Sequence, residues 1–382
     1  MKNTIILFFI MTAYLFSQGW NNTVTTTINE PNLVKMDLFT NKDGNHIIVQ
    51  NSNTTNSIKY YLVNSSGTVV RSSTIETSGY AEFPNISGDN DKVYLVYKLG
   101  SNLKANYTTN AGQSWNSVSP KAIGSNTCNG VDIVYDYQGL HVVYAMKDSD
   151  PDYETYYYKL NSSNSWVDYK NVTDYDANEV GGFPTVTVSE SRVHVSYNTG
   201  DQSEPVVNGG SAKSRDKYNT SWQTPQLIFS TESSLERIHA GQSKLFDFYY
   251  KWESGYSAYL YVKERSFSNT TWSSPVLLHT FMGLNSVVTA ANTADGKTHI
   301  VYEISNGVGY RSYNGSWSSE STIGESYISP NISSTSNDLF VVWGSDDYIR
   351  YRHYDAAPIA PQNLTASVNN GHPKLDWSAN RG

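Results

Sequence analysis

Three residues with chemically versatile side chains stand together in the segment Glu236-Arg237-Ile238-His239. A carboxylate, a guanidinium and an imidazole in such proximity could bind a carboxylate ligand, or could supply the acid, base and anion clamp of a hydrolase or lyase. Glu236, Arg237 and His239 are therefore the candidate catalytic residues. A purely binding role in the lining of a channel is the alternative.

Aromatic side chains in turn-rich segments could hold a sugar or a peptide by stacking. Trp252, next to Glu253, departs from the pattern of its surroundings and is predicted to lie in a loop. The candidate ligand-binding residues are Tyr80, Tyr175, Trp252, Glu253 and Tyr327. Packing of these rings against neighbouring loops is the alternative interpretation.

Asp148, Asp150 and Asp152 alternate along the chain as oxygen ligands do in calcium-binding loops. The segment lacks the Gly and the distal Glu of an EF-hand, and a solvated acidic loop is the alternative. No other cofactor is expected. Cys128 is the only cysteine, which excludes an intrachain disulfide and a thiolate zinc cluster, and it is expected to be a small buried residue.

The composition is typical of β-sheet and turns rather than of helices. The 382 residues include 30 Tyr and 26 Gly, only 16% are charged, and the net charge is −8. An acidic chain without a basic face argues against nucleic acid as a partner. Residues 1–18 contain an apolar run too short to span a bilayer comfortably, which predicts a signal peptide, a secreted protein and no transmembrane segment in the mature chain.

Short apolar runs recur seven times along the sequence. They are HIIVQ (46–50), YLVY (94–97), HVVY (141–144), HVSY (194–197), FDFYY (246–250), HIVY (299–302) and FVVW (340–343). Each follows a strand-like segment and precedes a Tyr-rich strand. After the first six of these sets come a turn and a tryptophan, with Val69 in the Trp place after the first set. These tryptophan positions recur in steps of 45 to 56 residues, which is typical of the blades of a β-propeller.

The last set of strands ends near residues 352–355 without a fourth strand. The opening stretch WNNTVTTTI (20–28) supplies it, since Trp20 and Ile28 are spaced as Trp115 and Ile123 are. An isolated four-stranded sheet buries too little to persist, whereas a closed ring packs each sheet between two neighbours. The sequence therefore predicts an all-β fold, a seven-bladed propeller over residues 19–355, closed by its N-terminal strand.

The segment TTNAGQSW (108–115) resembles the Asp-box hairpin of sialidase-like propellers, with Asn110 in the Asp place and Gly112 and Trp115 as in the motif. The resemblance implies that the tryptophans pack between blades, on the face opposite an active site. Catalytic sialidases carry an arginine triad and an Arg-Ile-Pro sequence. Arg237-Ile238-His239 is the nearest match and lacks the Pro, which favours binding over hydrolysis.

In propellers of this kind, ligands meet the loops that enter the first strand and those that join the second strand to the third. The longest and most acidic loops predicted there include 147–155, 174–183, 198–211 and 231–239. After a Pro-rich linker (356–361), residues 362–382 resemble the first two strands of a fibronectin type III domain, with Trp377 as its core Trp, and are too few to complete it.

The leading hypothesis is a secreted, monomeric binding module for a glycan or another extracellular partner. The alternatives are an exported sialidase-like glycoside hydrolase or polysaccharide lyase, and a structural or adhesin spacer. A pocket that holds an Arg cluster or a carboxylate pair would favour an enzyme, and a flat aromatic face would favour binding.

Overall fold

The computed structural model describes residues 19–378, with gaps at 53–55, 125–126, 148–152, 174–179, 201–209, 254–256, 283–286, 306, 326–327, 336–337, 346, 356–361 and 370–371. Within this part of the chain every regular element is a β-strand. The same residues include no helix with the length and apolar character needed to cross a bilayer. The predicted signal peptide lies outside the described residues.

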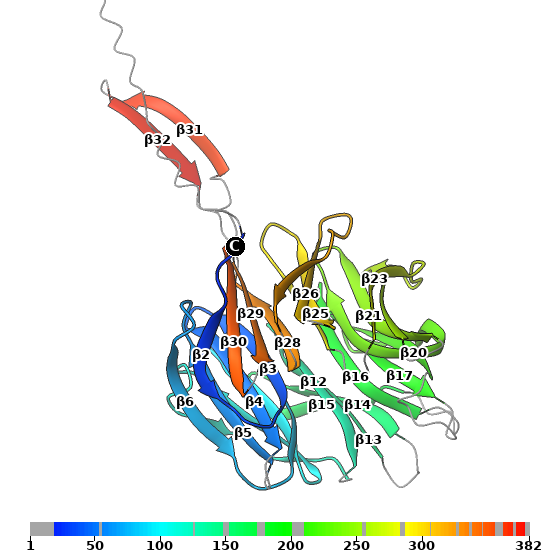
Figure 1. Cartoon of the computed structure of the whole chain (residues 1–382). Coiled ribbons are helices and arrows are strands. Elements are labelled where there is room, and N and C mark those ends of the chain that lie inside the picture. Colours follow the sequence, from blue (N-terminus) through cyan, green and yellow to red (C-terminus); the bar gives the residue numbers. More distant parts are fainter. Residues whose placement is uncertain are drawn as a thin grey trace, which may run out of the picture.

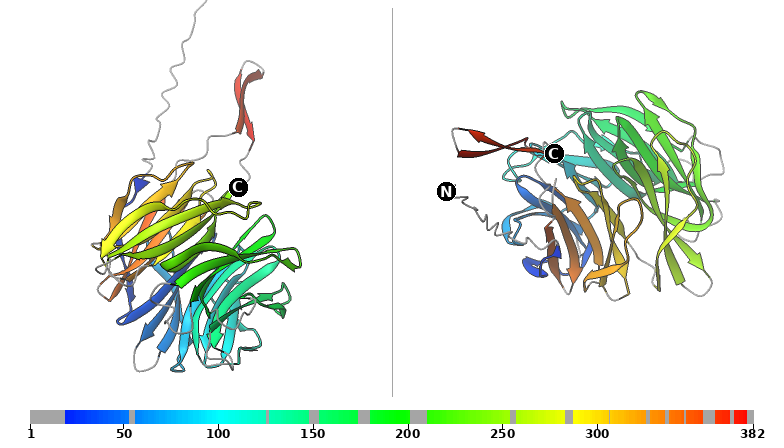
Figure 2. Two further views of the ribbon diagram at one scale, coloured as in Figure 1. Left: turned by 90° about the vertical axis from the view of Figure 1, so that its right-hand side faces the viewer. Right: turned by 90° about the horizontal axis from the view of Figure 1, so that it is seen from above.

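Seven antiparallel blades follow one another around a ring (Figures 1 and 2), which confirms the predicted seven-bladed propeller. Blade 1 contains β3 (Leu33–Asn41), β4 (Gly44–Ser52), β5 (Asn56–Val63) and β6 (Val69–Glu76). Blade 2 contains β7 (Ala81–Gly88), β8 (Val93–Leu99), β9 (Asn102–Thr108) and the short β10 (Asn116–Ser117) and β11 (Lys121–Ala122). Blade 3 contains β12 (Cys128–Asp136), β13 (Gly139–Lys147), β14 (Tyr153–Leu160) and β15 (Trp166–Asn171).

The second half of the ring continues the same order. Blade 4 contains β16 (Val180–Ser189), β17 (Arg192–Gly200), β18 (Gly210–Tyr218), β19 (Ser221–Trp222) and the first part of β20 (Gln226–Ala240). Blade 5 contains the rest of β20, β21 (Lys244–Glu253), β22 (Ser257–Ser266) and β23 (Val276–Met282). Blade 6 contains β24 (Val288–Asn292), β25 (Thr298–Ile304), β26 (Gly307–Tyr313) and β27 (Ser321–Gly324). Blade 7 contains β28 (Ile328–Ser334), β29 (Asp338–Ser345), β30 (Tyr348–Asp355) and, from the start of the chain, β1 (Gly19–Trp20) and β2 (Val24–Asn29).

The ring closes through the opening stretch, as predicted. Trp20 pairs with Tyr354 in β1, and after a short break Val24 pairs with Tyr351 in β2. The Thr26 hydroxyl also donates to the Ile349 carbonyl at 2.7 Å. The first and last strands of the propeller therefore share one sheet, which removes two open edges.

Blades 4 and 5 are joined by one long strand, which corrects the expectation of a loop at 231–239. Ser233 pairs with Gly210 of blade 4 on one side and with Lys251 of blade 5 on the other. The backbone of this polar segment is therefore satisfied by two sheets, so it continues as a strand rather than turning out to solvent.

The tryptophans pack each blade onto the blade before it, which confirms their predicted role. The ring centroids of Trp115 and Tyr60 lie 5.0 Å apart, those of Trp222 and Tyr157 5.1 Å, those of Trp317 and Phe246 5.6 Å and those of Trp20 and Tyr310 5.0 Å. Trp166 and Trp272 instead donate their indole N–H to Ser119 and Ser214 of the preceding blade. The Asp-box-like turn holds Trp115 in place, since Asn110 accepts the N–H of Ser114 at 3.0 Å.

A histidine begins the apolar run of the second strand in four blades. Each imidazole is buried and bridges strands of its own sheet. One ring nitrogen bonds a side chain of the third strand. The other bonds a side chain at the end of the first strand or in the turn that follows it. The four are His46 (Tyr60 and Asn41), His141 (Tyr157 and Asp136), His194 (Asp216 and Ser189) and His299 (Tyr310 and Thr293). Burial lowers the pKa of both His46 and His299 to about 4.

The C-terminal residues form a hairpin of β31 (Gln362–Asn369) and β32 (His372–Ser378). Two strands are common to many folds, so the fibronectin type III resemblance stays a prediction.

Candidate functional site

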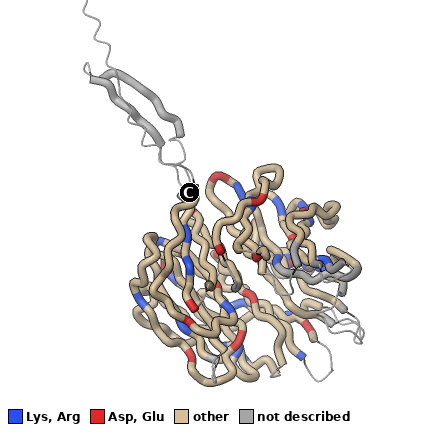
Figure 3. Tube along the Cα trace, in the orientation of Figure 1, with Lys and Arg blue, Asp and Glu red and all other residues tan. Residues whose placement is uncertain are grey.

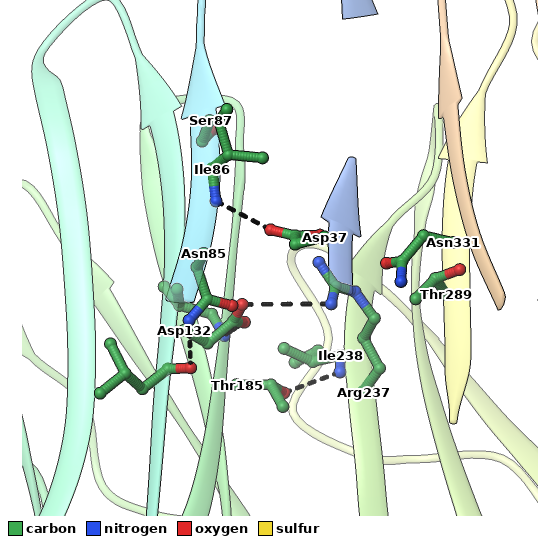
Figure 4. A network of polar contacts seen from close by, with 12 residues as sticks. Asp37, Asn85, Ile86, Ser87, Asp132, Thr185, Arg237, Ile238, Thr289 and Asn331 are labelled. Atoms are coloured by element: carbon green, nitrogen blue, oxygen red, sulfur yellow. Dashed lines mark hydrogen bonds and ion pairs between the residues drawn. The ribbon is translucent and has the colours of Figure 1, made fainter. Parts of the chain in front are cut away.

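The first strands of the seven blades surround the axis of the propeller, each beside the first strand of the next blade. One position on each of these strands carries a polar side chain, and these seven are called the ring residues below. They are Asp37, Asn85, Asp132, Thr185, Arg237, Thr289 and Asn331. Figure 4 shows them gathered from separate strands around the same central space.

Six ring residues join their blade to the next one. In four cases the side chain accepts a backbone N–H from the next blade, donated by the residue that directly follows the ring residue of that blade. These bonds are Asp37 from Ile86 (2.9 Å), Asp132 from Val186 (2.9 Å), Thr185 from Ile238 (2.9 Å) and Thr289 from Ile332 (3.1 Å). In two cases an amide donates to a carbonyl of the next blade: Asn85 to Val131 and Asn331 to Met36, both at 2.8 Å. These hydrogen bonds are a repeated structural device, so six of the seven positions are explained by folding.

Arg237 is the exception. A guanidinium cannot accept the N–H of the next blade as the carboxylates and hydroxyls do, and within the described residues it bonds no carbonyl of blade 6 as the two amides bond their next blade. Its side chain reaches across the central space toward Asp132 of blade 3 (Figure 4), with 4.0 Å between Nη1 and Oδ1. That distance is too long for a hydrogen bond. The Arg237 side chain is 29% exposed, so its donors remain accessible to a ligand in the channel.

A second cation lies close to Arg237. Lys35 stands two residues before Asp37 on β3, and therefore on the same side of that strand, with its ammonium 5.8 Å from the centroid of the Phe83 ring. Burial lowers the pKa of Lys35, while the charges of Asp37 and Asp132 oppose this shift. Burial raises the pKa of Asp37, and Arg237 draws it back down. Two cations and two carboxyl groups thus interact within one partly buried space.

Six of the strands that carry the ring residues, all but β24, have an irregularity shortly before the ring position. In three blades the irregularity is an X-Pro pair whose first residue has a left-handed backbone, with φ of 56° at Phe83, 47° at Phe183 and 41° at Ser329. Such bulges bend the strand and re-aim side chains. They shape the end of the channel where the first strands begin, which is called the channel mouth below.

The structure places the candidate catalytic residues on β20. His239 lies two residues after Arg237 and bonds Asn292 of blade 6 at 3.0 Å. Thr187 holds the corresponding position in blade 4, two residues after Thr185, and likewise bonds the next blade by accepting the N–H of Ala240. Burial lowers the pKa of His239 to about 4, so the imidazole is neutral at pH 7. Its hydrogen bond to Asn292 links blades 5 and 6. Glu236 is the extra residue of a register shift between Leu235 and Arg237, and its side chain lies outside the described residues.

The candidate ligand-binding residues are only partly described. Tyr80 is 76% exposed just before β7. Trp252 and Glu253 were expected in a loop but are the last residues of β21, paired with Ala258 and Ser257, because the hairpin ladder continues to its tip. Tyr175 and Tyr327 lie outside the described residues.

The calcium hypothesis is not tested by the structure, since Asp148, Asp150 and Asp152 lie outside the described residues as well. Among the residues that are described, no group of three or more potential metal ligands occurs. Cys128 is half-buried rather than fully buried, with its thiol 3.4 Å from the Gly130 carbonyl.

Sequence reasoning missed Lys35, Asp37 and Asp132. A signal was present, because aligning the seven first strands residue by residue places Arg237 in a column otherwise filled by Asp, Asn and Thr. Figure 3 shows acidic and basic positions interleaved along the blades, so charge alone does not single out the channel.

No family model matches the chain, and neither does any curated protein. Among solved structures, the chain is similar to a PL25 ulvan lyase bound to -[GlcA(1-4)Rha3S]-, with a TM-score of 0.52, 9% identity, and coverage of 89% of this chain and 94% of that chain. Trypanosoma rangeli sialidase with the inhibitor DANA matches with a TM-score of 0.49 and 10% identity, over 77% of this chain and 57% of that chain. SapL1 lectin with alpha methyl fucoside matches with a TM-score of 0.46 and 10% identity, over 78% of this chain and 98% of that chain. At these identities, the likeness to the lyase shows the propeller fold alone.

Proposed function

We propose that this chain is an exported glycan-binding propeller whose channel mouth holds an acidic saccharide on Arg237. The observation that carries the proposal is the exceptional ring position. Six ring residues are used to join blades, whereas the seventh is an arginine that projects its donors into the channel.

An acidic sugar fits the chemistry of this position. A guanidinium offers a planar fork of N–H donors that matches a carboxylate or a sulfate, and its partly buried surroundings strengthen the interaction relative to one at an open surface. Lys35 supplies a second positive charge nearby. Because the whole chain carries a net charge of −8, attraction for an anion has to come from this local pair. The structurally similar lyase was solved with a saccharide that contains glucuronate and a sulfated rhamnose, which supports the same ligand class.

Binding is favoured over catalysis by the state of the neighbouring groups. Asp37 accepts two backbone N–H groups, from Leu38 and Ile86, each at 2.9 Å, and Asp132 accepts that of Val186. His239 is bonded to Asn292. These candidate acids and bases are therefore engaged in joining strands and blades, whereas the Arg237 donors face the channel.

Isothermal titration with oligosaccharides that contain uronate or sulfate, and with neutral ones of equal length, tests the proposal. We expect the acidic ligands to bind more tightly, with affinity falling as salt is raised, and Arg237→Gln to weaken binding at least about tenfold, equivalent to roughly 1.4 kcal/mol. Arg71→Gln is the matched control, because Arg71 lies on the outer strand β6 and bonds the Ala111 carbonyl.

Equal affinity for neutral and acidic sugars, or unchanged binding by Arg237→Gln, would contradict the proposal. Product release from the same oligosaccharides is measured in parallel. Turnover that disappears on changing Glu236 or Arg237 would establish the hydrolase or lyase alternative instead.

A further inference from the structure

Phe183 is an exposed aromatic residue on an innermost strand. It lies two residues before the ring residue Thr185 on β16 and is 38% exposed, while Gly182 and Pro184 beside it are buried. One edge of β16 pairs with β17, and its flanks pack on the first strands of blades 3 and 5. These contacts leave the edge of β16 that borders the channel uncovered, so an exposed side chain near the start of this strand has access to the channel mouth.

The backbone that presents this ring is held in a costly conformation. A φ of 47° is unusual for a bulky side chain, and such strain persists only where the surroundings impose it. Asn129 of blade 3 accepts the Phe183 N–H at 3.3 Å. Gly130 allows Pro184 to approach so closely that an added Cβ would lie 3.2 Å from its Cδ. Blade 3 thus holds the backbone of the Phe183-Pro184 pair in this conformation.

The equivalent residues in other blades show that this exposure is not a consequence of the bulge itself. Phe83 has the same Phe-Pro sequence and a φ of 56°, but its ring packs against the core between blades 2 and 3. Ser329 has a similar backbone and no ring at all. At the equivalent positions of blades 2 and 7 the fold thus carries a packed ring or a small side chain. The bulge alone therefore does not account for the exposure of the Phe183 ring.

We propose that Phe183 is the stacking platform for a sugar ring of the ligand whose acidic group binds Arg237; this inference rests on the proposed function. The strands that carry the two residues are neighbours, because Thr185, two residues after Phe183, accepts the N–H of Ile238, the residue after Arg237, at 2.9 Å. The apolar C–H face of a pyranose packs on an aromatic ring. Arg237 would then select the charge of the ligand, and Phe183 would orient its ring.

Titration of Phe183 variants with the acidic oligosaccharide that binds the wild type tests this inference. Phe183→Leu keeps an apolar side chain, and Phe183→Asn suits a left-handed backbone, so both are expected to fold. Each should weaken binding about fivefold, which corresponds to roughly 1 kcal/mol, while Phe183→Tyr should retain wild-type affinity. Tyr137→Leu is the control, since Tyr137 is 78% exposed in the turn after β12, at the other end of the channel.

Proton NMR of the bound sugar gives a readout that a merely structural role would not change. Ring-current shifts of protons on one sugar face should be present with the wild type and Phe183→Tyr, and absent with Phe183→Leu. If Arg237→Gln weakens binding while all Phe183 variants bind as the wild type does, the stacking inference is wrong and the proposed function stands. If the wild type binds no acidic saccharide, the proposed function fails first.

Discussion

Mild acid should destabilise the propeller through the histidines that bridge its strands. His46 and His299 are buried, and their pKa is lowered to about 4, against about 6.5 in an unfolded chain. Between these values the unfolded state binds a proton that the folded state does not. Stability is therefore complete above about pH 6.5 and is lost as the pH falls toward 4.

The size of the effect follows from the two pKa values. At about pH 5.5 each of these histidines is roughly nine-tenths protonated when unfolded and almost unprotonated when folded, which costs about 1.4 kcal/mol per residue. Together they should lower the free energy of unfolding by about 3 kcal/mol relative to about pH 7.5.

Urea unfolding at the two pH values, for the wild type and for the double variant His46→Gln/His299→Gln, measures this contribution. Comparing the two proteins removes the pH dependence of other groups, such as Asp37 and Asp247, whose pKa values are raised by burial and which act in the opposite direction. The wild type should lose about 3 kcal/mol more than the double variant on acidification. A difference under about 1 kcal/mol would refute the assignment of neutral bridging imidazoles.

Two further substitutions test the ring and its turns. Trp20→Ala removes the contact between the closing strand and Tyr310 of blade 6. It should lower the free energy of unfolding in urea by roughly 3 kcal/mol, near the low end of large-to-small changes because Trp20 is half-buried. An unchanged unfolding midpoint would contradict closure by this strand. Gly112→Ala places a Cβ 2.3 Å from the Tyr60 ring in a left-handed turn and should cost roughly 2 to 4 kcal/mol. Its control is Gly315→Ala, where φ is similar and nothing lies within 4 Å of the added Cβ. This control should lower the free energy of unfolding by only about 1 to 2 kcal/mol. Equal losses of stability in the two variants would show that the Tyr60 contact is unimportant.

The repeat made much of the fold predictable. Each blade buries similar apolar runs, and the orphan Trp20 segment could only complete the unit that lacked a fourth strand. The continuous strand β20 was not predictable, since Ser233 is held by partners in two blades that lie far from it in sequence. The polar character of residues 231–236 indicated a loop, and long-range pairing overrode that local preference.

The site was predictable in part. Arg237 was recognised as a candidate from its neighbours Glu236 and His239, but its distinct role emerges only beside the six ring residues that join blades. His239 was a candidate because an imidazole can act as an acid or a base, but its ring is hydrogen-bonded to Asn292 of the next blade. Phe83 and Phe183 are alike in sequence, and only the packing of their blades shows which ring is buried and which is exposed.

The structure of the complex with an acidic oligosaccharide is the measurement that tests the central claim most directly. The account predicts a carboxylate or sulfate oxygen within about 2.7 to 3.2 Å of the Arg237 guanidinium at the channel mouth. A saccharide bound on the outer strands or on the opposite face, with Arg237 still directed at Asp132 alone, would contradict it.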